Sequence, residues 1–252
     1  MTTTYFRNFD TVGYRFGDNE KPVAFDRLSQ YVSVLESTQD NAAFYNKYTV
    51  IAGERPDTLS FKLYGTTDYY WTFFLMNEHL RESGWAIPSY DLLDEAKSRY
   101  PYRTVTTNTD VSANFPVGQV VTGASSGTTG TIIRKIPDLG QLVIDTGAEP
   151  NTDKFSSTEN ITYQDTDGNI QSAVLIAESE QYNSVHHYED ADGVYQDLTL
   201  FDFGTVGASL TPVTYRDRID LRNDELKEIV VIKPSSINSV VTQFQKLMKQ
   251  RL

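Results

Sequence analysis

Residues 48–65 read YTVIAGERPDTLSFKLYG and contain, in order, the signals of a strand, a turn and a helix. Tyr48 to Ile51 is rich in β-branched residues, which favour extended backbone. Asp57 or Thr58 has a side chain suited to cap a helix start, and Gly65 suits a helix end. The apolar positions between these caps are Leu59, Leu63 and Tyr64. We therefore predict one strand followed by one short helix.

The next residues extend this pattern into a small unit. Thr66 or Thr67 begins a second predicted helix, which ends near Asn77. Gly84 to Pro88 is predicted to be a short strand closed by proline. The result is a strand–helix–helix–strand unit of about forty residues, with enough aromatic residues to form a core.

The first 47 residues are predicted to form an extended arm with a hairpin, followed by a helix. The hairpin turn is expected near Gly17, and the helix runs from Asp26 to about Asn41. Isolated aromatic residues at such spacing do not form a core alone, so the arm is expected to contact a neighbouring subunit. The aromatic residues of the arm include Tyr5, Phe6, Phe9, Tyr14 and Phe16.

Residues 104–176 follow a short helix at 91–99 and are predicted to be β-structure. Turn signals recur every 8 to 12 residues, which is typical of a small barrel or sandwich. The expected strands are 119–122, 131–136, 141–145, 160–164 and 170–176. Residues 136–203 hold fourteen acids and one base, a net charge of −13, within a chain of net charge −12. The acidity therefore belongs to an inserted segment, and the rest of the chain is nearly neutral.

The C-terminal end has the clearest helical pattern. Ile229 to Ile232 predicts a buried strand, and Pro234 to Ser236 then leads into an amphipathic helix. Its apolar positions are Ile237, Val240, Val241, Phe244, Leu247 and Met248. We expect this stripe to dock in a groove of a partner protein, and the alternative is that it packs on the strand–helix–helix–strand unit.

The predicted fold class is α+β with four segments. Residues 1–47 form the arm and helix, and residues 48–103 form the small unit with its following helix. Residues 104–180 form the inserted β-rich domain, and residues 181–252 form the connecting segment and the C-terminal strand and helix.

Composition excludes several classes of protein. With no cysteine, the chain has no disulfide, no thiolate metal site and no cysteine nucleophile. No apolar run reaches the length of about 18 residues that a membrane span requires, and the first residues do not indicate a secretory signal. Nucleic-acid binding is not expected either, because the basic C-terminal helix first needs a partner for its apolar face.

The search for catalytic motifs finds none, and we predict no enzyme, no cofactor and no metal. His186 and His187, followed by Glu189 and Asp190, form the cluster that most resembles a metal site. Adjacent residues of a strand point to opposite sides, so an exposed polar strand is favoured there. His79 is expected to pack against or cap its helix.

Two further segments have a functional and a structural interpretation. The glycine-rich loop Gly123–Gly130 is able to hold a phosphate through its N–H groups, but β-type residues follow it, so a hairpin tip is favoured. Asp165, Asp167 and Asn169 resemble part of a calcium loop, but no distal glutamate follows, so a solvated turn is favoured. The many acids of the acidic segment also allow an interpretation as the paired carboxylates of a glycosidase.

The unit at 48–88 resembles a LysM module. The elements that carry this resemblance are Tyr48, Val50, Gly53, Asp57, Leu59, Tyr64, Gly65, Trp71, Asn77 and Pro88. In the usual pattern Gly-Asp-Thr-Leu is continuous, whereas here Glu54 to Pro56 separate Gly53 from Asp57. This insertion lengthens the loop that lines the glycan groove in LysM modules.

Two blocks together resemble a baseplate wedge protein, with a LysM-like fold, of T-even-type contractile-tailed bacteriophages. The first block runs from Tyr48 to Asn77 and continues to Trp85, and the second runs from Asn223 to Ser239. The resemblance implies a structural virion protein that is assembled in the host cytoplasm and joins a sixfold ring. The implied partners are the core-bundle wedge proteins and the sheath-initiating lysozyme-like wedge protein, with the central hub as a further candidate.

Three functions follow as hypotheses. The first is a non-enzymatic protein that links baseplate wedges around the hub during assembly. The alternative is a peptidoglycan-binding module that acts through the LysM-like unit. The third is that the acidic β insert binds sugars or partners on the virion surface.

Overall fold

The computed structural model describes residues 11–17, 21–26, 44–147, 153–196 and 209–250. It contains both helices and several separate sheets, which confirms the α+β class. The chain divides into two compact units. Unit 1 consists of Met1–Ser89 with Arg222–Leu252, and unit 2 consists of Tyr90–Leu221.

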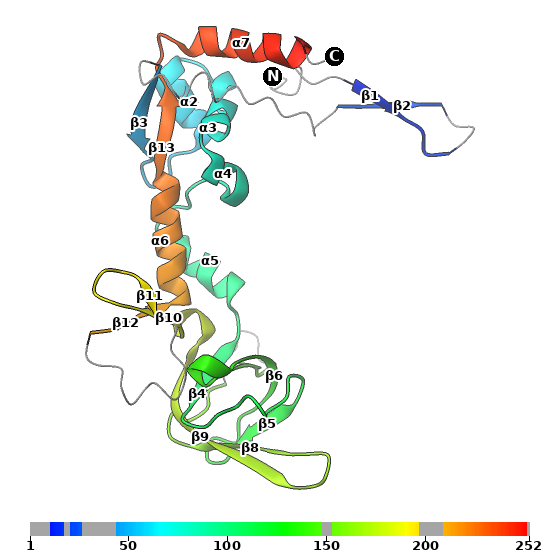
Figure 1. Cartoon of the computed structure of the whole chain (residues 1–252), viewed down its shortest axis with the longest axis vertical. Helices are drawn as coiled ribbons and strands as arrows, with labels where there is room; N and C mark the ends of the chain where they lie inside the picture. Colours follow the sequence, from blue (N-terminus) through cyan, green and yellow to red (C-terminus); the bar gives the residue numbers. More distant parts are fainter. Residues whose placement is uncertain (1–10, 18–20, 27–43, 148–152, 197–208, 251–252) are drawn as a thin grey trace. The chain divides into compact units, whose positions relative to one another are not determined.

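The sheet of unit 1 pairs two strands that lie far apart in the sequence. Strand β3 (Tyr45–Thr49) runs antiparallel to β13 (Glu228–Ile232), so that Thr49 faces Glu228 across 179 residues of chain. The four consecutive β-branched residues Ile229 to Ile232 favour this strand. Figure 1 shows the two strands side by side in unit 1. The predicted strand at 229–232 is therefore confirmed.

The predicted strand at Gly84–Pro88 is wrong, because this segment has no regular secondary structure. Its hydrogen bonds are made with or by side chains and not with a neighbouring strand. Trp85 Nε1 donates to Glu54 O at 2.7 Å, and the Asn223 amide bonds both the N–H and the C=O of Ile87. The second strand of the sheet is β13, from the other end of the chain.

Four short helical elements follow β3: α2 (Pro56–Tyr64), the 3₁₀ turn η2 (Thr67–Tyr69), α3 (Trp71–Met76) and α4 (Glu78–Ser83). Helix α2 begins at Pro56 with Arg55 as N-cap, so the prediction of Asp57 or Thr58 as the cap is wrong. Proline fits the first helical position because no N–H is needed there. Gly65, with φ of 73°, ends α2 as predicted. Thr66 caps η2 by accepting from Asp68 N, while α4 was not predicted as a separate helix.

Two hydrophobic clusters lie against alternate residues of β13. Ile229 and Val231 belong to one cluster, which also contains Val50, Leu59, Phe73, Leu80 and Leu226. Ile232 belongs to the other, which contains Trp71, Leu75 and Met76 with four residues of helix α7 (Ile237–Gln250). Alternation along a strand places neighbouring residues on opposite faces, so β13 is covered on both faces.

Unit 2 contains a closed barrel of six antiparallel strands. Their order around the barrel is β4 (Arg103–Thr107), β7 (Gln141–Asp145), β6 (Thr129–Ile136), β5 (Val120–Gly123), β8 (Asn160–Gln164) and β9 (Ile170–Glu180), and β9 pairs with β4 to close it. Of the two predicted architectures, barrel or sandwich, the barrel is the one formed. Its interior holds Val105, Val121, Ile132, Leu142, Ile144, Ile161 and Leu175, all essentially inaccessible to solvent.

The barrel begins and ends at neighbouring residues. Gln181 N donates to Tyr102 O at 2.8 Å, just outside the first and last strands. Such adjacent ends are typical of an inserted domain. The barrel at 103–180 matches the predicted insertion within one residue, although the list of expected strands lacked β4.

The rest of unit 2 is mixed. Helix α5 (Leu92–Arg99) forms as predicted. The strands β11 (Tyr195–Gln196), β10 (Val185–Glu189) and β12 (Thr211–Thr214) form a three-stranded sheet, and two 3₁₀ turns lie at Pro137–Leu139 (η3) and Gln181–Asn183 (η4). Helix α6 (Tyr215–Lys227), which was not predicted, contains the boundary between the two units.

The two units divide the chain differently from the four predicted segments. Helix α5 belongs with the barrel rather than with residues 48–89, and the C-terminal strand and helix belong with residues 1–89. The physical reason is the pairing of β3 with β13, which joins the two ends of the chain.

The predicted hairpin of the arm is confirmed. Strand β1 (Thr11–Tyr14) pairs antiparallel with β2 (Val23–Asp26), and Asp26 is the last residue of β2. The predicted helix after Asp26 lies at 27–41, outside the described residues, and so do Tyr5, Phe6 and Phe9.

Candidate functional site

The ten residues of the LysM-like motif all lie in unit 1. Val50, Leu59, Trp71 and Asn77 are buried. The others are Tyr48, Gly53, Asp57, Tyr64, Gly65 and Pro88, of which the two glycines have positive φ angles. The motif therefore contributes mainly core residues and turns, and its polar members act through specific hydrogen bonds.

Asn77 is the polar residue that the fold uses most. Its Nδ2 donates to Val230 O at 2.8 Å, and its Oδ1 accepts from Val230 N at 2.8 Å. The same Nδ2 also donates to Phe73 O, at the end of α3. The amide thus bonds both polar groups of one residue on β13, as a neighbouring strand would, and it is only 4% exposed.

Asn223 makes a similar pair of hydrogen bonds, in this case from helix α6 near the C-terminal end to residue 87. Its Oδ1 accepts from Ile87 N at 2.7 Å, and its Nδ2 donates to Ile87 O at 3.0 Å. Asn77 thus connects the first block of the resemblance to β13, and Asn223 connects the second block to residue 87. Together with the pairing of β3 and β13, these contacts assemble the two blocks into one unit (Figure 1).

The inserted residues Glu54 to Pro56 are built into the fold. The Glu54 carboxylate accepts from Tyr48 Oη at 2.8 Å, from Lys62 Nζ at 3.1 Å and from Ile51 N at 3.3 Å. The Glu54 side chain is only 9% exposed. The carboxylate in the loop expected to line a glycan groove therefore already has three donors from its own chain.

The predicted docking stripe on α7 is largely buried within unit 1. Ile237, Val240, Val241 and Phe244 pack with Trp71, Leu75 and Met76, and the Phe244 and Trp71 rings lie 4.9 Å apart. For these four residues the alternative, packing within the chain, is the one that the structure shows. The side chains of Leu247 and Met248 lie outside those described, and their role in an interface stays a prediction.

The hairpin of the arm carries an exposed aromatic cluster. Tyr14, Phe16 and Phe25 are 58%, 67% and 47% exposed, and Val23 beside them is 47% exposed. The Phe16 ring lies edge-on to both other rings, at centroid distances of 5.1 and 5.9 Å. A two-stranded hairpin is marginally stable alone in water, so this apolar surface suits contact with another molecule.

The histidine pair differs from its predicted geometry. Strand β10 has a bulge between Val185 and His187, so the two adjacent rings lie together instead of on opposite sides. His186 Nδ1 and His187 Nδ1 are 2.9 Å apart, and His187 Nε2 is 2.9 Å from Glu189 Oε1. The predicted exposed strand is wrong for His187, which is 8% exposed.

The hydrogen bonds around this pair assign the tautomers. Arg218 donates to His186 Nε2, because a guanidinium has no acceptor. His186 then donates from Nδ1 to His187, which donates from Nε2 to Glu189. Burial, with Arg218 nearby, lowers the pKa of His186 to about 4, so this ring is neutral at pH 7. All four ring nitrogens are thus used in one directional chain.

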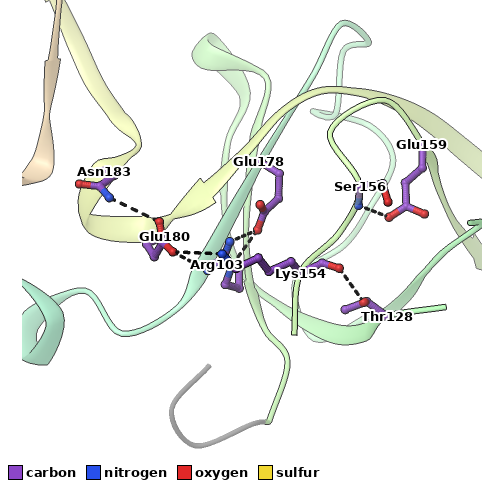
Figure 2. Close-up of polar contacts among 8 residues, drawn as sticks. All are labelled: Arg103, Thr128, Lys154, Ser156, Glu159, Glu178, Glu180 and Asn183. Atoms are coloured by element: carbon purple, nitrogen blue, oxygen red, sulfur yellow. Dashed lines mark hydrogen bonds and ion pairs between the residues drawn. The ribbon is translucent and has the colours of Figure 1, made fainter. Parts of the chain in front are cut away.

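The glycine-rich loop surrounds a carboxylate of its own chain. Glu159 accepts from the backbone N–H groups of Ser125, Ser126 and Ser156 at 2.7 to 2.8 Å, and from the hydroxyls of Ser125 and Ser126. Burial acts to raise the pKa of Glu159, but these hydrogen bonds prevail and lower it to about 2. Figure 2 shows the contact with Ser156. The favoured hairpin tip is confirmed, and its anion-binding groups hold Glu159.

Two turns of unit 2 share one construction that was missed in the sequence. In Asp165–Gln171 and Asp190–Gln196 the spacing is Asp-x-Asp-Gly-x-x-Gln. In each turn the first carboxylate accepts from two backbone N–H groups and from the final glutamine. The carboxylate of Asp165, one of the three candidate calcium ligands, is thus engaged within its own turn, and the predicted turn between two strands forms there. The repeated spacing was the available signal.

Buried charge in unit 2 is concentrated at Arg103. Its side chain is 3% exposed and bonds Glu178 through two nitrogens and Glu180 at 3.1 Å (Figure 2). Glu180 Oε2 also accepts from Asn183 Nδ2, and Glu180 Oε1 lies 3.8 Å from Lys154 Nζ. Hydrogen bonding to its own backbone, together with Arg103, lowers the pKa of Glu180. A glycosidase acid needs a raised pKa, whereas that of Glu180 is lowered, so Glu180 suits a structural ion pair with Arg103.

Within the described ranges, no group of three His, Asp or Glu residues is arranged to hold a metal ion. His79 lies on α4, and its Nε2 is buried without a hydrogen-bond partner in the described part of the chain. No helix among the described residues is long and apolar enough to cross a membrane. No family model matches this chain, and no curated protein matches its sequence.

Proposed function

We propose that the chain is a structural, non-enzymatic wedge component of a contractile phage tail baseplate. It links wedge subunits to each other around the central hub during assembly. The observation that carries the proposal is the assembly of the two family-like blocks into one unit through β13, Asn77 and Asn223. This contact supports the proposal, because the two segments that carry the resemblance lie together in one unit.

The proposal includes a LysM-like unit whose strands come from both ends of the chain. Strand β3, helices α2 and α3 and strand β13 supply the strand–helix–helix–strand order. The barrel is then inserted between the last helix of this unit and its closing strand. On this view the acidic β domain is a decoration of the virion protein and leaves the wedge-binding unit intact.

The aromatic hairpin is the proposed docking arm. Tyr14, Phe16 and Phe25 offer a compact apolar surface, and large aromatic side chains dominate the energetics of many interfaces. The proposed recipients are the core-bundle wedge proteins and the sheath-initiating lysozyme-like wedge protein. Contacts to the hub would follow in the complete sixfold baseplate.

Co-expression with the other wedge proteins tests this function. We expect the full chain to co-purify in a stable wedge complex, and a Phe16→Ser/Phe25→Ser variant to lose at least tenfold in yield of that complex. Tyr90→Ser is the matched control, because Tyr90 is 75% exposed and lies in unit 2. Failure of the unmodified chain to join any wedge complex would overturn the proposal.

Peptidoglycan binding is the second candidate, and one observation favours it. Ile51, in the loop of the LysM-like unit, is 60% exposed and would suit the apolar face of a sugar ring. Sedimentation with purified peptidoglycan separates the candidates. Saturable binding of the unmodified chain, weakened by Ile51→Ser, would support the glycan module. We expect instead that the unmodified chain binds no more peptidoglycan than the variant does.

A further inference from the structure

The sheet of β3 and β13 in unit 1 has one edge that its own side chains cover and one edge that the described residues leave open. On β13, the polar groups of Val230 are bonded by the Asn77 amide, and Ile232 O accepts from Tyr64 Oη at 2.9 Å. This edge therefore has no room in its hydrogen-bond pattern for another strand. Any extension of the sheet has to occur along β3.

The hydrogen-bond register identifies the open groups of β3. Val50 N donates to Lys227 O, and Lys233 N donates to Phe44 O, at the two ends of the pairing. In an antiparallel pair, directly bonded residues alternate with residues whose N–H and C=O point away. The backbone N–H and C=O groups of residues 44, 46, 48 and 50 therefore point toward β13. Those of Tyr45, Lys47 and Thr49 point away from β13, toward the outer edge of the sheet. No described residue bonds to the backbone groups of these three.

We propose that the outer edge of β3 binds an extended segment of another protein, which adds a third strand and places an acidic side chain opposite Lys47. Strand addition to an open edge is an established mode of peptide recognition, in which backbone hydrogen bonds supply affinity and side chains supply specificity. Lys47 is exposed and is the one charged residue of β3. A carboxylate on the added strand complements it.

The charges at this edge also fix where the acid belongs. Thr49 Oγ1 donates to Glu228 Oε1 at 2.9 Å, so a carboxylate lies beside the Thr49 end of the strand. An acid of the added strand opposite Thr49 would lie one strand away from the Glu228 carboxylate and be repelled by it, whereas an acid directly opposite Lys47 is attracted.

A second copy of the chain is the occupant that the charges disfavour. When two β3 edges pair antiparallel with the most hydrogen bonds, Tyr45 lies opposite Thr49 of the other copy and Lys47 lies opposite Lys47. Lysine on an edge strand is a common device against such pairing between identical copies. The partner is accordingly a different, locally acidic chain. The inference goes beyond the wedge proposal, because the edge belongs to unit 1 in whatever assembly the chain enters.

Backbone amide exchange of the full chain, followed by NMR, tests the inference with two synthetic probes. Both are eight-residue peptides of alternating valine and threonine, one with a central glutamate and the other with a central lysine. In the free protein we expect fast exchange at Tyr45, Lys47 and Thr49, and slow exchange at Asn46 and Tyr48. The glutamate peptide is expected to slow the three outward amides and to bind at least tenfold more tightly than the lysine peptide.

Charge reversal provides the control. Lys47→Glu is expected to exchange the preference of the two peptides, whereas Lys97→Glu, an exposed change in unit 2, leaves it unaltered. Slow exchange of the outward amides in the free protein at every concentration would show that the edge is already occupied within the chain. Protection that grows with protein concentration would show pairing between copies. Either result overturns the inference, and so does equal binding, or no binding, of the two peptides.

The outcome is separable from the wedge proposal. The peptides are tested on the isolated protein, and wedge assembly is tested by co-purification with hairpin variants. A chain that enters wedges but ignores both peptides would keep the proposed function and reject the open-edge inference.

Discussion

The barrel of unit 2 and the β3–β13 sheet of unit 1 differ in how far apart in the sequence their paired strands lie. In the barrel, three of the six pairings join consecutive strands: β5 to β6, β6 to β7 and β8 to β9. In unit 1, β3 pairs with β13 across 179 residues. Local pairings are specified by nearby turns, whereas a distant pairing depends on side chains that recognise the returning strand. Asn77 has that role for β13, and Asn223 joins helix α6 to Ile87.

The two units also differ in what fills their interiors. The barrel core consists mainly of Val, Ile and Leu, and the buried charged residues of the barrel include Arg103 and Glu159. Unit 1 has two smaller clusters, one on each face of β13, and the second includes helix α7. Damage to one unit should therefore leave the other folded, and the following variants examine this independence.

The largest effect is expected from Phe244→Asp in unit 1. The substitution removes a ring that is 2% exposed and packs on Trp71, and it places a charge in an apolar cluster. Loss of a buried Phe alone costs about 3–5 kcal/mol, and a buried unpaired carboxylate adds to this, so unit 1 should unfold. NMR should show loss of the unit 1 resonances and retention of those of the barrel. Gln243→Asp, on the exposed side of α7, is the control, and a folded Phe244→Asp protein would contradict the packing.

Arg103→Met should produce the next largest effect, now in the barrel. The change leaves Glu178 and Glu180 without their guanidinium, and an uncompensated buried charge costs about 3–5 kcal/mol. Denaturant unfolding followed by barrel resonances should show this loss, with unit 1 unaffected. In the double variant with Glu178→Met much of the stability should return. A double variant as unstable as the single one would indicate that the contact is not the cause.

Asn77→Ala should weaken unit 1 by a smaller amount. Three hydrogen bonds are lost, and the part-buried N–H and C=O of Val230 remain without these partners. Unsatisfied buried groups cost about 1–3 kcal/mol each, partly recovered by relaxation. The amide of Val230 should exchange faster than that of its neighbour Val231, which pairs with β3. Equal exchange of the two amides would argue against a strand-like role for Asn77.

The smallest effect should be the acid response of the barrel, through Glu159. The pKa of this carboxyl falls from 4.5 to about 2 in the folded protein, so its stabilising contribution is complete above pH 4.5. That contribution is lost as pH falls through about 2, because the unfolded state binds the proton first. Glu159 should account for about 2–3 kcal/mol of the difference in unfolding free energy between pH 5 and pH 2. Glu159→Gln should abolish this part of the pH dependence, and an unchanged dependence would assign it to other carboxylates.

Much of the fold could be predicted from local patterns in the sequence. The apolar spacing of Ile237 to Phe244 predicted α7, and Ile229 to Ile232 predicted β13. Four of the five expected barrel strands agree with the structure within two residues at each end, and the fifth, expected at 170–176, extends to Glu180 as β9. These successes share a cause, because a turn residue or an apolar period acts over a few neighbours and is visible in any short window.

The failures share a different cause. Gly84 to Pro88 has the composition of a strand, but Trp85 and Ile87 find hydrogen-bond partners at Glu54 and Asn223, so no strand forms. Helix α6 has a weak apolar pattern, and a capping pair between Thr214 and Asp217 begins it. The contact between His186 and His187 depends on a bulge in β10, which residue types do not reveal. For residues 84–88 and the histidine pair the deciding partner is remote or the backbone is irregular, whereas the capping pair of α6 is local and was a signal that the sequence contained.

Local patterns in the sequence are enough to predict the α+β class, the hairpin arm and the β-rich insertion with its concentrated acidity, and they contain the two blocks that resemble a wedge protein. The folded structure adds that the blocks form one unit, that the insertion closes into a barrel and that the α7 stripe packs inside the chain. It also distinguishes the covered edge of β13 from the outer edge of β3, to which no described residue bonds. The physical reason is that short-range backbone preferences are encoded residue by residue. The pairing of distant strands and the covering of an apolar face depend on which surfaces meet in the folded chain.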